Sequence, residues 1–159
     1  MLSQQHAGAE LDPPVVLVSA CLLGLRCRYD LESRENCALT SDLSRLGLLP
    51  VPVCPEQLGG LPTPRAPMVF EGEGGGEGVF SGAARLVNSD GKDCTKEMKL
   101  GALETLRLVR LLRIRRAYLK SRSPSCGWKS VSTDSDPEPV SGVTAVALER
   151  AHVEIIPVD

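Results

Sequence analysis

Three of the six cysteines each follow a segment that the sequence predicts as a buried strand: Cys21, Cys54 and Cys126. The three strand segments are residues 15–20, 48–53 and 116–120. In open parallel sheets, the loops that follow different strands converge at the carboxyl edge, where ligands bind. Three thiols distant in sequence can therefore meet at one place. Three thiolates with one coordination position left open would make a reactive metal centre rather than a structural one.

Strands and helices alternate along the chain, which indicates how the thiols are positioned. The run 15–20 is apolar without alternation, as in a central strand that is covered on both faces. Pro50 and Pro52 predict that the second strand is ragged or paired on one side only. Further elements are expected as strands at 83–87 and 153–156, and as helices at 38–47, 95–113 and 142–151.

This order of elements predicts an α/β fold. We expect residues 14–159 to form a single three-layer domain with a mostly parallel sheet of about five strands, of the Rossmann-like or flavodoxin-like kind. Residues 1–13 are expected to be a flexible N-terminal tail. The acidic, glycine-rich segment 71–78 lacks the lysine and the flanking elements of a phosphate-binding loop, so it is expected to be a flexible surface loop.

The composition favours a small-molecule partner in a reducing compartment. A net charge of −2 and an aromatic content of 3% offer little for nucleic acid to bind, so a nucleic-acid partner is not expected. No apolar segment is long enough to span a membrane, and the first residues lack the features of a signal peptide. We therefore expect a cytoplasmic protein, in which six cysteines indicate metal binding or catalysis more than disulfides.

Polar residues beside two of the three cysteines could take part in a reaction. Glu56 follows Cys54 by two residues and is placed for proton transfer at the same centre. Before Cys126, three hydroxyls could orient a substrate or a water molecule, or could simply form a turn: Ser121, Ser123 and Ser125.

Several common cysteine sites do not match this chain. A phosphatase loop needs an arginine where this chain has Cys27, and its neighbours Arg26 and Arg28 are out of register. No Cys-x2-Cys pair occurs, which disfavours zinc ribbons, ferredoxin-type runs and thioredoxin motifs. The two histidines lie near the two ends of the chain and argue against a histidine-based triad.

Four longer motifs are distributed over most of the chain. They are Ser-Ala-Cys-Leu-Leu-Gly with Cys-Arg-Tyr-Asp at 19–30, Pro-Val-Cys-Pro-Glu-Gln-Leu-Gly-Gly-Leu-Pro-Thr-Pro-Arg at 52–65, Leu-Lys-Ser-Arg-Ser-Pro-Ser-Cys-Gly at 119–127 and Gly-Val-Thr-Ala at 142–145. Over about residues 15–158, the chain resembles a small domain family that includes the bacterial thiouracil desulfidases.

The resemblance implies a [4Fe-4S] cluster held by Cys21, Cys54 and Cys126, with the fourth iron open to the sulfur of a thiolated pyrimidine or nucleoside. Glu56 would be the acid or base that activates water or protonates an intermediate, and Ser123 would assist it. The reaction would replace C=S by C=O in a thiolated nucleobase or a related thioamide, and it would release sulfide with no net redox change. A soft iron centre suits a soft sulfur ligand. The expected substrate contacts are Ser19, Arg28, Ser121 and Ser125.

The remaining cysteines and two departures from the family pattern complete the predictions. Cys27 lies in a family motif and is a reserve ligand, whereas Cys37 and Cys94 lie outside the motifs and are expected to be incidental. The resemblance leads us to expect glycine where this chain has Leu31. It also predicts a glycine-rich stretch in place of residues 128–139, a segment expected to lie over the site.

Two other functions stay open on the sequence. One is a non-catalytic carrier of sulfide or of an iron–sulfur cluster. The other is a three-cysteine zinc hydrolase in which Glu56 acts as base on a zinc-bound water.

Overall fold

The apolar run after Pro14 forms the central strand of the sheet, β1 (Val15–Ser19), in the computed structural model, which describes residues 13–159. Its side chains alternate between two packed faces. Leu17 belongs to the hydrophobic cluster on one face, whereas Val16 and Val18 belong to the cluster on the other. Burial on both faces explains why the sequence of this strand is apolar throughout.

Four parallel strands make the main sheet, in the order β2-β1-β5-β6. β1 lies between β2 (Leu49–Val53) and β5 (Arg116–Lys120). β6 (Glu154–Val158) pairs with the other side of β5. β2 is an edge strand with a neighbour on one side only, which confirms the predicted one-sided pairing. Proline has no backbone N–H to donate, so Pro50 and Pro52 are tolerated in such a strand.

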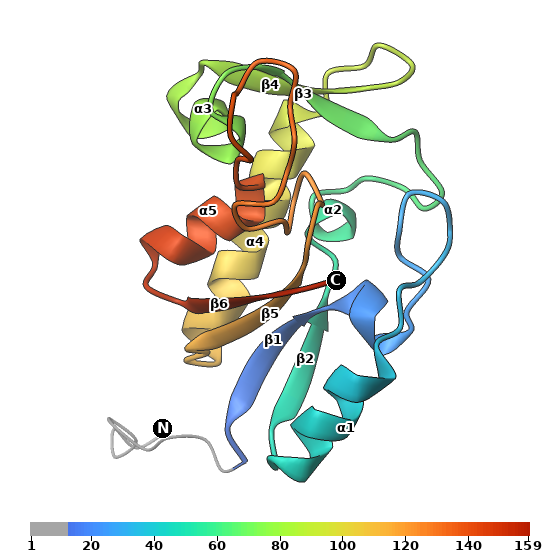
Figure 1. Ribbon diagram of the computed structural model, residues 1–159, viewed down its shortest axis with the longest axis vertical. Helices are drawn as coiled ribbons and strands as arrows, with labels where there is room; N and C mark the ends of the chain where they lie inside the picture. The colour runs from blue at the N-terminus through green and yellow to red at the C-terminus, as the bar shows by residue number, and fades with distance from the viewer. Residues whose placement is uncertain (1–12) are drawn as a thin grey trace, which may run out of the picture.

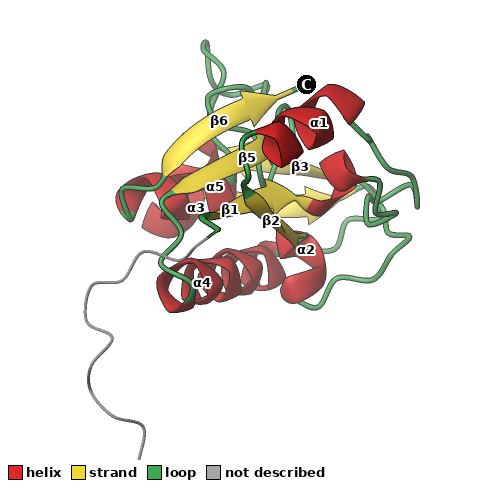
Figure 2. Ribbon diagram, turned by 90° about the horizontal axis from the view of Figure 1, so that it is seen from below, coloured by secondary structure: helices red, strands yellow, loops and turns green. Residues whose placement is uncertain are grey.

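Helices cover both faces of this sheet (Figure 2). Their bounds are α1 (Cys37–Arg45), α4 (Thr95–Leu111) and α5 (Val143–Arg150). The helix α1 packs through Leu39 and Leu43 on one face, and α4 and α5 pack on the other. The predicted three-layer α/β fold with a parallel sheet is therefore confirmed, with four strands in the sheet where about five were expected.

The fifth expected strand exists but lies outside the main sheet. It is β4 (Ala84–Asn88), which pairs antiparallel with β3 (Met68–Gly72) as a separate two-stranded sheet (Figure 1). Between these strands, the segment predicted as a flexible loop forms the helix α3 (Gly75–Ser81), so that prediction is wrong.

Contacts with the rest of the fold explain why glycines form this helix. Gly76 is buried, and its N–H donates to the carbonyl oxygen of Ser141 at 2.8 Å. A Cβ at Gly76 would lie 2.7 Å from the carbonyl oxygen of Gly142. At the start of the helix, Asp136 accepts a hydrogen bond from the Gly74 N–H at 2.9 Å. Bare backbone is therefore what allows α3 to pack against the start of α5.

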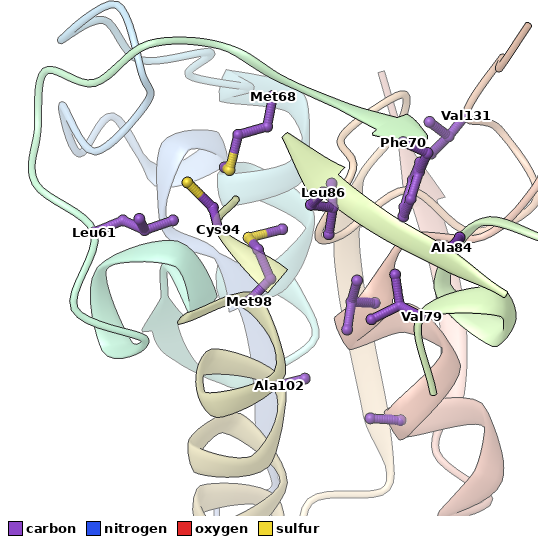
Figure 3. Packing of buried hydrophobic residues seen from close by; sticks show 12 residues of the cluster. Leu61, Met68, Phe70, Val79, Ala84, Leu86, Cys94, Met98, Ala102 and Val131 are labelled. Carbon is purple, nitrogen blue, oxygen red and sulfur yellow. The ribbon is translucent and has the colours of Figure 1, made fainter. Parts of the chain in front are cut away.

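The two-stranded sheet covers a hydrophobic cluster of its own, which includes Cys94. Figure 3 shows the Cys94 side chain beside Met68 and Met98. Cys94 is 2% exposed, and Cys37 lies exposed at the first residue of α1. Neither cysteine lines the cavity described below, and that both are incidental stays a prediction.

Leu31 has a left-handed backbone conformation, with φ of +60°, at the position where the family pattern predicts glycine. This conformation costs an ordinary L-residue about 1–2 kcal/mol, which glycine avoids at a smaller cost in unfolded-state entropy. We expect Leu31→Gly to raise the free energy of unfolding by about 0.5–1 kcal/mol in urea titrations.

Leu46 provides the matched control, because it is also exposed but has a negative φ of −84°. Leu46→Gly is expected to lower the free energy of unfolding. A Leu31→Gly variant that is less stable than the wild type would show that the leucine side chain contributes more than the strain costs.

Among residues 13–159, no helix combines the length and the apolar character needed to cross a lipid bilayer. The predicted tail, residues 1–13, lies outside the described residues apart from Pro13. Its boundary with the domain at residue 14 stays a prediction.

Candidate active site

A cavity of about 400 Å³ lies at the carboxyl ends of β1, β2 and β5. The three cysteines predicted as ligands line it together with Cys27 and Glu56. The parallel arrangement of the strands brings these segments together, as the sequence predicted.

Cys21 is positioned by a tight turn directly after β1. The chain enters a 3₁₀ helix, Ala20–Leu23, which Gly24 ends in a left-handed conformation with φ of +88°. The Leu25 N–H then donates to the Ala20 carbonyl at 3.2 Å, which folds the chain back toward the cavity. This return places the thiol of Cys27 beside that of Cys21.

The four cavity thiols are close enough to change one another's acidity. A hydrogen bond between the thiols of Cys21 and Cys27 lowers the pKa of Cys21 and raises the pKa of Cys27 to about 11. The pKa of Cys54 is raised mainly by a hydrogen bond with Cys27 and secondly by burial, whereas burial is the main cause that raises the pKa of Cys126. Because metals bind thiolates, metal binding here would release protons.

Cys54 and Glu56 stand at the start of a short helix, α2 (Pro55–Leu58), that the sequence did not reveal. Cys54 is its N-cap residue, and Pro55 occupies the first position, where proline is favoured. The Cys54 Sγ lies 3.6 Å from the carbonyl oxygen of Cys27. The carboxylate of Glu56 is buried in the wall of the cavity.

Gly101 allows α2 to lie directly on α4, and through α2 it positions Glu56. A Cβ at Gly101 would stand 1.9 Å from the carbonyl oxygen of Pro55.

We expect Gly101→Ala to lower the free energy of unfolding by about 1–3 kcal/mol, although alanine is the better helix former. Urea titration measures the effect. Leu100→Ala, at an exposed position of the same helix, should change stability by no more than about 0.5 kcal/mol. A gain in stability for Gly101→Ala would contradict the close approach of α2 and α4.

Arg65 is the site residue that sequence reasoning missed. Its Nε donates to Glu56 Oε2 at 2.6 Å, and its Nη2 contacts the same oxygen. Both side chains are buried, and a buried carboxylate requires a partner. The need of a buried Glu56 for a cationic partner, and the arginine at the end of the motif at 52–65, could together have identified Arg65 from the sequence.

Ser123 shapes the loop that presents Cys126. Its Oγ accepts hydrogen bonds from the N–H groups of Ser125 at 3.2 Å and of Cys126 at 3.1 Å. Within residues 13–159, its own hydroxyl proton has no acceptor, and Ser123 lines the cavity. The hydroxyl therefore combines a structural contact with a proton that remains to be donated.

Ser125 lies outside the cavity. Its Oγ is 3.0 Å from the Thr144 Oγ1, and both residues are fully buried. The Thr144 N–H also donates to the Ser125 carbonyl at 2.9 Å, so the Gly-Val-Thr-Ala motif fastens this loop to α5. Ser125 is therefore placed as a structural residue rather than as a substrate contact.

The other three predicted substrate contacts line the cavity. The Ser19 Oγ accepts the backbone N–H of Lys120 at 3.0 Å, which joins the ends of β1 and β5. Arg28 pairs with Asp30 at 3.2 Å. Ser121 is nearly buried next to Lys120. Their contact with a substrate stays a prediction.

The segment 128–139 does not cover the site, so that prediction is wrong. None of its residues lines the cavity. In Figure 1 this segment, in orange, runs up beside α3, where Asp136 accepts from Gly74. A bridge between Val131 and Val140 closes it into a loop of its own.

Cys21, Cys54 and Cys126 are the residues of this cavity that could hold a metal or an iron–sulfur cluster. Among the described residues, no three His, Cys, Asp or Glu side chains already converge as the ligands of a single metal ion. A [4Fe-4S] cluster distributes its ligands over separate irons, and it is held by cysteine thiolates. Sulfur donors from three strand ends fit that requirement.

Four thiols and a paired carboxylate line one cavity at the carboxyl edge of a parallel sheet, which is where α/β proteins of this class bind their ligands. Comparison with known proteins narrows this class. Residues 16–159 match the 2-thiouracil desulfurase family. The chain belongs to this family, and it is a sulfur-removing enzyme.

The chain is also similar to a curated protein and to a solved structure, and the family match together with the solved structure confirms the resemblance seen in the motifs. The chain is 37% identical over 147 residues to YbbK, an uncharacterised protein of Bacillus subtilis (strain 168), and the match covers 89% of this chain and 94% of the relative. The fold is similar to the solved structure of the [4Fe-4S]-dependent thiouracil desulfidase TudS. That match has a TM-score of 0.72 and 33% sequence identity over 89% of each chain.

Proposed function

We propose that this enzyme converts the C=S group of a thiolated pyrimidine to C=O in a [4Fe-4S]-dependent reaction without net redox change. The observation that carries the proposal is the presence of Cys21, Cys54 and Cys126 around one cavity with Glu56 in its wall. The solved relative, named as a [4Fe-4S]-dependent thiouracil desulfidase, supports both the cofactor and the substrate class.

The residues of the cavity divide the work of this reaction. Cys21, Cys54 and Cys126 hold the cluster, which supplies a soft metal site for sulfur when it is bound. Glu56 takes a proton from the water that adds to the thiocarbonyl carbon, or returns one to the departing sulfur. The free hydroxyl proton of Ser123 is available to a polar atom of the substrate.

The reaction balances without an external oxidant or reductant, because C=S and water give C=O and hydrogen sulfide. A cavity of about 400 Å³ accommodates a small ring compound. Ser19, Arg28 and Ser121 are the proposed contacts with the thiolated pyrimidine or nucleoside. The enzyme acts on a small molecule rather than on a nucleic acid, and it works in the cytoplasm, where thiols stay reduced.

Cluster analysis and product analysis test the proposal. The protein is purified and reconstituted without oxygen, and its iron, acid-labile sulfide and visible spectrum are measured. We expect about four irons and four sulfides per chain. Incubation with 2-thiouracil or 4-thiouracil should then release sulfide and uracil over many turnovers.

Two outcomes would overturn the proposal. Bound zinc with no cluster would favour the zinc hydrolase. An intact cluster that releases or binds sulfide only once per chain would favour the carrier.

A further inference from the structure

Arg65 has more hydrogen-bond partners than any other cation that lines the cavity. Besides Glu56, it reaches three oxygens through Nη1: the Cys27 carbonyl at 3.2 Å, the Pro62 carbonyl at 3.1 Å and the Thr63 Oγ1 at 3.0 Å. Its side chain is only 7% exposed. A guanidinium with this many partners is fixed in position.

The pairing of Arg65 with Glu56 is specific. The other arginines of the cavity wall pair with different carboxylates. These pairs are Arg28 with Asp30, Arg34 with Glu32, and Arg122 with Asp159. Among the described residues that line the cavity, Glu56 is the only acidic one, so Arg65 is paired with the single carboxylate found there.

The guanidinium engages one carboxylate oxygen and leaves the other free. Both Nε and Nη2 of Arg65 contact Oε2 of Glu56. Within the described residues, Oε1 has no hydrogen-bond partner, yet Glu56 lines the cavity. By elimination, Oε1 is the oxygen that is available for a proton transfer.

Arg65 also joins the carboxylate to the segment that carries a site thiol. The Cys27 carbonyl that accepts from Arg65 lies 3.6 Å from the Cys54 Sγ. In addition, the backbone N–H of Arg65 donates to the Tyr29 carbonyl at 2.9 Å. Arg65 therefore holds the carboxylate in register with the loop from Cys27 to Tyr29 through both its side chain and its backbone.

We propose that Arg65 is the positioning residue of the desulfuration reaction: it holds Oε2 of Glu56 so that Oε1 faces the substrate. This inference rests on the proposed function. A carboxylate that is free to rotate in the wall would lose its alignment, and small misplacements of a reacting group can cost about 100-fold in rate.

The first test replaces the planar guanidinium of Arg65 by the ammonium group of lysine. Arg65→Lys keeps the positive charge but cannot place two N–H groups on one oxygen while reaching the Cys27 carbonyl. We expect kcat for sulfide release to fall about 10–100-fold with KM nearly unchanged and with iron content equal to the wild type. Arg85→Lys is the matched control, because Arg85 pairs with Glu71 on the exposed face of the two-stranded sheet. It should leave kcat unchanged.

A second variant separates positioning from folding. Arg65→Ala should lose more activity, and added guanidinium at low concentration should restore part of kcat. A role only in folding would instead lower the iron content and kcat together, with no rescue. In a Glu56→Gln background, Arg65→Lys should reduce the residual rate no further. An independent, multiplicative loss would overturn the proposal, as would a wild-type kcat in Arg65→Lys.

A structural readout keeps this test independent of the proposed function. In crystals of Arg65→Lys, we expect the Glu56 carboxylate to leave its wild-type orientation, with or without turnover. If the wild-type enzyme released no sulfide, the proposed function would fail and the orientation of Glu56 would still decide the role of Arg65. An unchanged carboxylate in the variant would refute that role.

Discussion

Replacing Glu56 by glutamine is expected to lower the rate of sulfide release by about 100- to 10,000-fold while the iron content stays at the wild-type level. Glutamine preserves the shape of the side chain and an acceptor for Arg65, but it cannot exchange a proton. Rates measured with 4-thiouracil under anaerobic conditions, together with iron and sulfide analysis, check the prediction.

Stability should also change, because Arg65 loses a charged partner in a buried site. Breaking such a pair can cost about 3–5 kcal/mol, and the amide oxygen should recover part of that loss. Thermal unfolding of the apoprotein measures it. Glu71→Gln is the matched control, since Glu71 also pairs with an arginine but lies exposed. Wild-type turnover in Glu56→Gln, or a loss of rate that merely follows a loss of iron, would exclude Glu56 as the acid or base.

The second large effect concerns the thiols. Single replacement of Cys21, Cys54 or Cys126 by serine should abolish the visible absorption of the cluster and remove turnover, because each thiolate would ligate a separate iron. Cys94→Ser is the control. Cys94 is more deeply buried than any of the three, and it packs beside Met68 and Met98 (Figure 3).

A Cys27→Ser variant distinguishes the ligand set Cys21, Cys54 and Cys126 from a set in which Cys27 replaces one of them. If the three-cysteine set is right, Cys27→Ser retains iron, although its neighbours Cys21 and Cys54 lose a hydrogen-bonding thiol. Loss of the cluster in Cys27→Ser, with retention in one of the three other variants, would place Cys27 in the set instead.

The main sheet and most of the site were predictable because they depend on local patterns. The apolar run of β1 and the one-sided pairing of β2 follow from strand rules, and the cysteines then gather at the carboxyl edge of the sheet. The positions of Cys21, Cys54 and Cys126 around one cavity confirm that reasoning.

The parts that were missed depend on contacts between distant segments. Residues 71–78 carry no helical pattern, and α3 exists because Gly76 packs on the backbone of Ser141 and Gly142. The same contact region draws 128–139 away from the cavity, through Asp136. Arg65 was missed because a turn-rich segment says nothing about which buried carboxylate its guanidinium will meet.

The distribution of the cavity thiols along the chain has a consequence for biosynthesis. The strands β2, β1 and β5 are neighbours in space, but β5 is synthesised long after the other two. Chains emerge from the ribosome N-terminus first, so a nascent chain can present Cys21, Cys27 and Cys54 before Cys126 exists. The donor set proposed for the cluster would therefore be complete only after β5 has docked beside β1, and delivery of the proposed cluster would come after that step. Until then, the early thiols are open to capture by other thiophilic metals.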